Sequence, residues 1–138
     1  MTRPTKWEMM MNIAEEVRLR STCSRLQVGC IVTNRELTRI LAMGYNGMEA
    51  GGKNECDSSL PGQCGCIHAE VNALIKAEPG PKAVFVTTSP CLMCARLMIN
   101  ADVREVYYGS EYRVEDGARL LESRGVQCHP CSTPKGHG

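Results

Sequence analysis

Two short runs rich in metal ligands constrain the fold of this chain most strongly. The first is His68-Ala69-Glu70 and the second is Pro90-Cys91-Leu92-Met93-Cys94. Helices are predicted over residues 68–78 and 91–99, with a strand over 83–88 between them, so both runs stand at helix starts. One imidazole and two thiols can bind a single ion only if these helix starts lie side by side. The fold must therefore bring together two points that a helix and a strand separate.

The rest of the chain also alternates between helix and strand patterns. Residues 7–20 place apolar side chains at helical spacing, and the methionine-rich face of this helix is interpreted as core. A further helix is predicted over 114–124, and strands are predicted over 28–33, 40–43, 103–108 and 126–128. This order predicts a three-layer α/β/α sandwich with a mixed sheet of about five strands. We expect one domain over residues 1–138, with 129–138 as a flexible tail.

Composition limits the partners of the protein. The 138-residue chain carries a formal net charge of +1 and no long basic run, which argues against a polynucleotide substrate. No apolar stretch is long enough to span a bilayer, and the amino-terminal segment has no apolar signal core. We therefore expect a cytoplasmic protein with neither a polynucleotide nor a membrane as its partner.

The cysteines favour metal ligation over disulfides, because their number, nine, is odd and no export signal is present. Cys91 and Cys94 lie three residues apart at a helix start, so both thiolates can bind one Zn²⁺ together with His68. Three ligands leave the fourth tetrahedral position open for water, as in catalytic zinc sites. Glu70 is close enough to move protons to and from that water and is predicted to be catalytic. A His-x-Glu motif alone often arises by chance, and a Cys-x-x-Cys motif alone could be redox-active. Together and in this order, however, the two motifs match the signature of zinc deaminases.

The chain resembles the deoxycytidylate (dCMP) deaminases of the cytidine deaminase superfamily over nearly its whole length. Besides the two ligand runs, the resemblance rests on residues 20–23 (Arg-Ser-Thr-Cys), 28–32 (Val-Gly-Cys-Ile-Val), 44–48 (Gly-Tyr-Asn-Gly-Met), 50–52 (Ala-Gly-Gly) and 111–113 (Glu-Tyr-Arg). It implies a hydrolase of the C–N bond of a cyclic amidine, which converts dCMP to dUMP for thymidylate synthesis. Whether dCTP is also a substrate stays open.

The resemblance also implies a substrate site. Its residues are expected to be Asn46, Gly47, Ala69, Ser89, Tyr112, Arg20 and Arg113. Asn46 would contact the sugar or the base, and backbone around Ala69 and Ser89 would read the pyrimidine edge. The phosphate would lie near the loop after Asn46, with Tyr112 over the site. Arg20 or Arg113 would bind that phosphate, although each could equally be an ordinary surface charge.

A second group of cysteines predicts a structural zinc site. Cys23, Cys56, Cys64 and Cys66 come from two loops, and several members of the family that this chain resembles hold a second zinc in corresponding loops. The alternative is a set of buried inert thiols, and the tight Cys64-x-Cys66 spacing leaves open whether both ligate. Of the other cysteines, Cys30 is expected in the core. The role of Cys128, His129 and Cys131 stays open, with a non-metal role favoured.

The resemblance further implies a homo-oligomer, expected as a hexamer, that is regulated by dCTP and dTTP, with Mg²⁺ accompanying a triphosphate effector. Two other functions stay open. One is a different deaminase of the superfamily, acting on tRNA adenosine, guanine or free cytidine. The other is a non-enzymatic zinc-binding module, which would require a fourth protein ligand where water is expected.

Overall fold

The computed structural model describes residues 2–55, 64–109 and 115–131. Its strands form one mixed sheet in the order β2-β1-β3-β4-β5. They are β1 (Gly29–Thr33), β2 (Ile40–Tyr45), β3 (Lys82–Val86), β4 (Val103–Tyr108) and β5 (Gln127–Pro130). Strand β1 pairs antiparallel with β2 and β3, whereas β4 pairs parallel with β3 and β5. The predicted mixed sheet of about five strands is confirmed.

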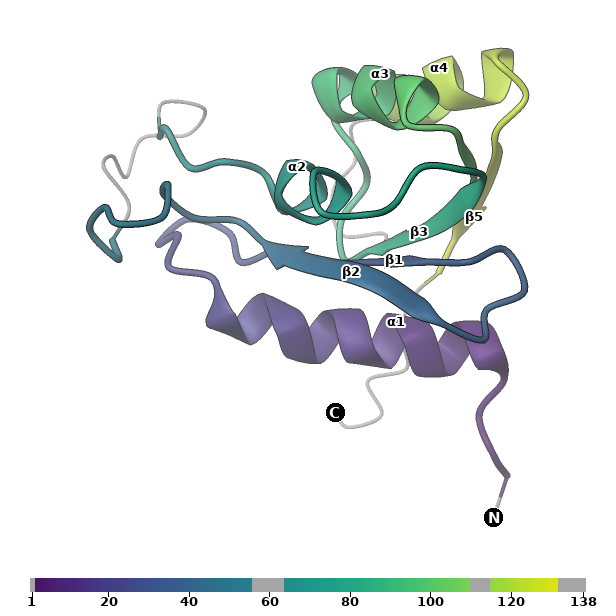
Figure 1. Ribbon diagram of the computed structural model, residues 1–138, viewed down its shortest axis with the longest axis horizontal. Coiled ribbons are helices and arrows are strands. Elements are labelled where there is room, and N and C mark those ends of the chain that lie inside the picture. Colours follow the sequence, from purple (N-terminus) through teal and green to yellow (C-terminus); the bar gives the residue numbers. More distant parts are fainter. Residues whose placement is uncertain (1, 56–63, 110–114, 132–138) are drawn as a thin grey trace.

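Helices cover both faces of the sheet, as Figure 1 shows. Helix α1 (Lys6–Val17) lies along one face, and α2 (Ala69–Leu74), α3 (Leu92–Asn100) and α4 (Asp116–Ser123) lie on the other. The predicted three-layer α/β/α sandwich is therefore confirmed. None of the helices in the described part of the chain combines the length and the apolarity needed to cross a bilayer.

The side chains of β3 point alternately to the two faces of the sheet, and the core is thereby divided into two parts. Val84 and Val86 point into the larger cluster, which includes Met98 of α3, whereas Phe85 points to the other face and packs near Met11 of α1. All five side chains are fully buried. Each such burial contributes roughly 1.5–3 kcal/mol, so both helical layers are held firmly to this central strand.

Several element ends differ from the prediction, and three of them show the effect of hydrogen bonding or strand pairing. Helix α1 ends at Val17 and continues as a 3₁₀ turn, Arg18–Arg20. Helix α2 ends at Leu74 and not at residue 78, because the amides of Lys76 and Ala77 bond carbonyls three residues back and tighten the chain. Strand β5 runs to Pro130, two residues into the expected tail, because its parallel pairing with β4 continues to Tyr108.

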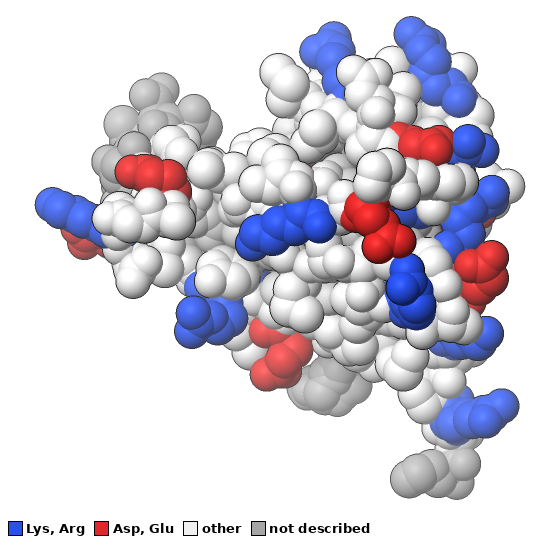
Figure 2. Space-filling model, viewed as in Figure 1, with Lys and Arg blue, Asp and Glu red and all other residues white. Residues whose placement is uncertain are grey.

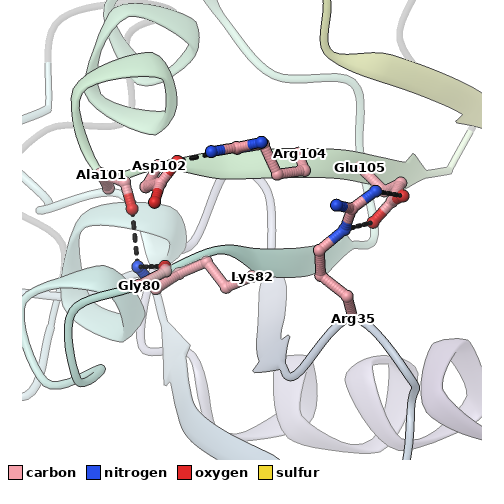
Figure 3. A network of polar contacts seen from close by, with 7 residues as sticks. All are labelled: Arg35, Gly80, Lys82, Ala101, Asp102, Arg104 and Glu105. Atoms are coloured by element: carbon pink, nitrogen blue, oxygen red, sulfur yellow. Dashed lines mark hydrogen bonds and ion pairs between the residues drawn. The ribbon is translucent and has the colours of Figure 1, made fainter.

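Polar contacts fasten the end of the sheet that Figure 3 shows. The ammonium group of the buried Lys82 donates to the carbonyl oxygens of Gly80 and Ala101, each at 2.6 Å. Ala101 is the C-cap of α3, where a cation stabilises the negative end of the helix dipole. Arg35, from the turn between β1 and β2, pairs with Glu105 of β4. Lys82 thus ties the end of α3 to β3, and Arg35 ties the turn between β1 and β2 to β4.

Gly44 lets the backbone of α2 pack directly on β2. A Cβ atom at this position would lie 2.6 Å from the Ala73 nitrogen and 2.7 Å from the Ala69 oxygen. We expect Gly44→Ala to lower the free energy of unfolding by about 1–3 kcal/mol, because the two backbones must move apart. Urea denaturation would measure this loss. Met43→Ala, at a 49% exposed position on the same strand, is the control, and an equally large effect there would contradict the explanation.

Candidate active site

The two ligand runs meet where α2 and α3 begin. His68 is the N-cap of α2 and Cys91 is the N-cap of α3, both with extended backbone, and Cys94 lies in the first turn of α3. The Nδ1 atom of His68 lies 3.3 Å from the Sγ atom of Cys94 and 3.6 Å from that of Cys91. One ligand atom from each residue lies within 4.8 Å of the others, so the three can hold one metal ion.

The electrostatics of this trio suit a soft dication. Hydrogen bonds from Cys94 and then from His68 lower the pKa of Cys91 to about 3. The neighbouring Cys91 thiolate and burial raise the pKa of Cys94, and the hydrogen bond to Cys91 raises the pKa of His68. The trio thus offers one thiolate, at Cys91, and one thiol, at Cys94, together with an imidazole. This donor set fits Zn²⁺.

Glu70 lies in the first turn of α2 and is only 3% exposed. Burial is the main cause that raises the pKa of its carboxyl group. The fully buried Cys30 lies in β1, and burial and then the charge of Glu70 raise the pKa of its thiol, so this cysteine stays protonated. Glu70 is therefore a buried carboxyl group that binds a proton more tightly than an exposed one, two residues from a proposed ligand. Cys30 belongs to the core, as expected.

One cavity of about 290 Å³ contains the predicted catalytic groups. Its lining residues are Cys23, Arg25, Leu26, Val28, Asn46, Cys64, Cys66, His68, Ala69, Glu70, Thr88, Ser89, Pro90 and Cys91. The predicted substrate residues Asn46, Ala69 and Ser89 thus line the same space as Glu70 and two of the proposed zinc ligands. The structure brings these residues together as the sequence predicted.

The side chain of Asn46 forms hydrogen bonds with main-chain groups of the cavity wall. Its Oδ1 atom accepts a hydrogen bond from the Val28 amide at 2.9 Å, and its Nδ2 atom donates to the Leu26 carbonyl at 2.7 Å. Asn46 is 8% exposed. It therefore fixes the segment 26–28 as one wall of the cavity.

The other predicted substrate residues lie elsewhere or outside the described residues. Gly47 bridges to Ile67 through two backbone hydrogen bonds and is not among the lining residues described. The guanidinium of Arg20 lies 5.7 Å from the ring centroid of Tyr45 and does not line the cavity. Tyr112 and Arg113 lie outside the described residues.

A second cysteine trio lines the same cavity. The sulfur atoms of Cys23, Cys64 and Cys66 lie within 4.8 Å of one another and can hold a metal ion. Cys56, the fourth predicted ligand, lies outside the described residues. Both Cys64 and Cys66 join the trio, although their tight spacing had left this open.

The carboxyl-terminal cysteines take no part in a metal cluster among the residues described. The Cys128 thiol donates weakly to carbonyl oxygens, and Cys131 is buried against the α1 side of the sheet. The ring of His129 stacks on Tyr107 with centroids 4.5 Å apart. Packing and weak hydrogen bonds account for the positions of these three residues.

Sequence reasoning missed several cavity residues, of which Arg25 and Thr88 are the polar ones. Arg25 comes two residues after Cys23, which is the one sequence signal that could have indicated it. The Oγ1 atom of Thr88 is buried and has no hydrogen-bond partner among the described residues. A buried hydroxyl group in this state is uncommon and is usually satisfied by water or a ligand.

Helix α4 supports the loop that carries Cys91. A Cβ atom on Gly117, in the first turn of α4, would overlap the carbonyl oxygen of Pro90 and lie 2.9 Å from that of Cys91. The absence of a side chain at Gly117 thus lets α4 pack directly beneath the start of α3.

Comparison with known proteins agrees with this geometry. Residues 4–110 match the family model described as the cytidine and deoxycytidylate deaminase zinc-binding region. The chain belongs to this family. It is 37% identical over 118 residues to ComE operon protein 2 of Bacillus subtilis, a match that covers 78% of this chain and 61% of that protein. It is 31% identical over 150 residues to the deoxycytidylate deaminase of Schizosaccharomyces pombe, which covers 96% of this chain and 46% of that enzyme.

Solved structures of this family share the fold. The dCMP deaminase from the cyanophage S-TIM5, crystallised in complex with dCMP and dUMP, superposes with a TM-score of 0.83 at 35% identity. This match covers 95% of the present chain and 100% of the phage chain. A guanine deaminase from Nitrosomonas europaea, 19% identical with a TM-score of 0.61, shows only that the fold is shared. The resemblance to the deoxycytidylate deaminases is confirmed, although the chain spans 61% of the Bacillus relative and less than half of the two yeast relatives.

Proposed function

We propose that this family member is a zinc-dependent deaminase that hydrolyses dCMP to dUMP and ammonia. The observation that carries the proposal is that one cavity is lined by both His68 and Cys91 of the metal trio and by the buried carboxyl group of Glu70. A closed structural zinc site would need a fourth protein ligand, and the described part of the chain places only three ligand residues in this cluster. The arrangement therefore favours hydrolysis over a purely structural role.

The proposed mechanism assigns the proton transfers to Glu70. His68, Cys91 and Cys94 would hold the zinc ion, which would supply the activation of water by lowering its pKa to roughly 7. Glu70 accepts a proton from the water that attacks the ring carbon bearing the amine. It passes this proton to the ring nitrogen, which gives a tetrahedral adduct that carries a hydroxyl group and the amine. Glu70 then takes the proton of that hydroxyl group and gives it to the amine, so that the C–N bond breaks, the carbonyl forms and ammonia leaves. Its burial keeps bulk water from competing for these protons.

The choice of dCMP rests on the relatives. The Schizosaccharomyces pombe relative is a deoxycytidylate deaminase, and the S-TIM5 enzyme was crystallised with dCMP and dUMP. On the face that Figure 2 shows, basic and acidic side chains are interspersed, and no basic stripe for a polynucleotide is visible among the described residues. The product would supply dUMP for thymidylate synthesis, which fits the proposed cytoplasmic location.

For the substrate site, we propose that backbone around Ala69 and Ser89 reads the pyrimidine. Both residues are buried in the cavity wall. Asn46 holds segment 26–28 of the cavity wall and is proposed to contact the sugar, with Gly47 next to it supporting the turn. A role for Tyr112 over the site stays a prediction, because it lies outside the described residues.

A substrate panel tests this function. Loss of ultraviolet absorbance would be followed with dCMP, dCTP, deoxycytidine, cytidine and guanine, and an adenosine-bearing tRNA stem-loop would be assayed for inosine. We expect the highest kcat/KM for dCMP. A higher kcat/KM for any unphosphorylated compound or for the tRNA would contradict the assignment. A higher value for dCTP would retain the deaminase and change the nucleotide.

We also propose a second zinc held by Cys23, Cys64 and Cys66, with Cys56 as the fourth ligand. Three thiols within 4.8 Å of one another support this site, which would tie the loop before His68 to the turn after α1. The wild-type protein should hold two zinc ions per chain, one in each trio. Cys66→Ala is expected to lower this content to one ion per chain and to lower the Tm. Cys128→Ala, outside both trios, is the control. Unchanged metal content in Cys66→Ala would refute the second ion.

The assembly and regulation implied by the resemblance also remain proposals. For a homo-hexamer, light scattering coupled to gel filtration would give a mass six times that of the 15.2 kDa chain. Activation by dCTP with Mg²⁺ and inhibition by dTTP would appear as opposite shifts of the dCMP saturation curve. A monomer with no response to either nucleotide would remove both proposals without affecting the deaminase.

A further inference from the structure

Arg25 is the only lysine or arginine among the described residues that line the cavity. Its side chain is partly buried. The ion pairs found among the described residues involve other arginines, namely Arg18, Arg35, Arg39, Arg104 and Arg119. In those described ranges, no carboxylate forms an ion pair with the guanidinium of Arg25. Its charge is therefore available to a ligand in the cavity.

The loop that carries Arg25 is fixed on both sides. Before it, the Ser21 hydroxyl accepts a hydrogen bond from the Cys23 amide at 3.1 Å. After it, the Gln27 amide group donates to the Ser21 carbonyl at 3.2 Å, and Asn46 holds the next residues of the wall. A guanidinium on a fixed loop loses less conformational freedom when it binds a ligand. The position of Arg25 at the cavity is thus built into the fold.

The charges of the cavity indicate which ligand group Arg25 receives. Glu70 and the Cys91 thiolate are the acidic groups beside the proposed chemistry, whereas Cys23, Cys64 and Cys66 belong to the second trio. A nucleotide whose base meets Glu70 must place its phosphate away from these groups, against another part of the wall. Arg25 supplies the fork of N–H donors that matches a phosphate.

We propose that Arg25 binds the 5′-phosphate of the substrate and so makes the enzyme prefer a nucleotide over a nucleoside. This inference rests on the proposed function. Arg25 takes the phosphate-binding role that the resemblance suggested for Arg20, because Arg20 lies over the ring of Tyr45 and not at the cavity.

The test compares dCMP with deoxycytidine, which differ only in the phosphate. Arg25→Gln is expected to lower kcat/KM for dCMP by about 10- to 100-fold, the equivalent of one charge-assisted hydrogen-bonded contact, chiefly through KM. The kcat/KM for deoxycytidine should change far less, so the ratio between the two substrates falls. Arg25→Lys should restore part of the ratio, because lysine keeps the charge without the fork. Arg39→Gln removes the same charge from a pair exposed at the surface and is the control.

Several outcomes would overturn the inference. An unchanged substrate ratio in Arg25→Gln would do so, and so would equal losses for both substrates together with loss of zinc, which would indicate a structural role beside Cys23. A collapse of the ratio in Arg20→Gln instead would assign the phosphate to that residue. Calorimetric binding of dUMP against deoxyuridine separates this inference from the proposed function. If the wild-type protein does not turn over dCMP, an Arg25-dependent preference for dUMP would still support phosphate binding here.

Discussion

Replacing Glu70 with glutamine is expected to lower kcat for dCMP by about 10²–10⁴-fold, the usual contribution of a general acid–base group. Glutamine keeps the length and shape of the side chain, so the cavity wall and the start of α2 should remain in place. It cannot accept the proton of the attacking water or return one to the ring nitrogen. Steady-state kinetics would measure the loss, and zinc analysis of the same sample would show that the metal is retained.

The control for this variant is Glu78→Gln, which makes the same change at an exposed glutamate just beyond α2. It should leave kcat and metal content at their wild-type values. Wild-type turnover by Glu70→Gln would remove the carboxylate from the proton transfers. Loss of zinc from Glu70→Gln would instead show that the carboxylate supports the metal trio.

Removal of Cys94 is expected to abolish turnover together with metal binding at the catalytic trio. Cys94 lies 3.3 Å from the His68 imidazole and is fully buried, so no other described side chain can take its place without movement of α3. Cys94→Ala should lose one zinc per chain and reduce kcat by about 10³-fold or more, because the metal contributes several kcal/mol to the transition state. Chelation of the wild-type protein should give the same loss, reversible by added zinc.

Cys131→Ala is the matched control, because this cysteine is also buried but belongs to neither trio. It should retain both ions and full turnover. If Cys94→Ala kept its zinc and its activity, the assignment of a three-ligand site that includes Cys94 would be wrong. If chelated wild-type protein stayed fully active, the hydrolytic role of the metal would be wrong as well.

The sequence predicted the metal trio because each ligand stands at a helix start that local signals mark. His68 follows a long loop, and Pro90 precedes Cys91, so both starts could be placed to within a residue. The three-layer fold followed from the order of apolar patterns along the chain. The end of β5 could not be predicted in this way, because it depends on parallel pairing with β4 and not on local preference.

Arg25 escaped the sequence analysis for a similar reason. Apart from its position two residues after Cys23, no local pattern distinguishes Arg25 from Arg20, and both lie in the same short segment after α1. What separates them is Asn46, whose amide group bonds Leu26 and Val28 from 18 or 20 residues away. Long-range contacts of this kind decide which arginine reaches the cavity, and they become visible only in three dimensions.

The close packing of Gly117 against the carbonyls of Pro90 and Cys91 has a practical consequence for shortened versions of this protein. The region shared with the family model stops at residue 110, so a minimal version cut there would keep every proposed ligand of the catalytic ion. It would lose α4, against which the loop that carries Cys91 packs. Such a trimmed protein is expected to hold zinc poorly despite an intact ligand sequence, and surface redesign of α4 should leave this glycine alone.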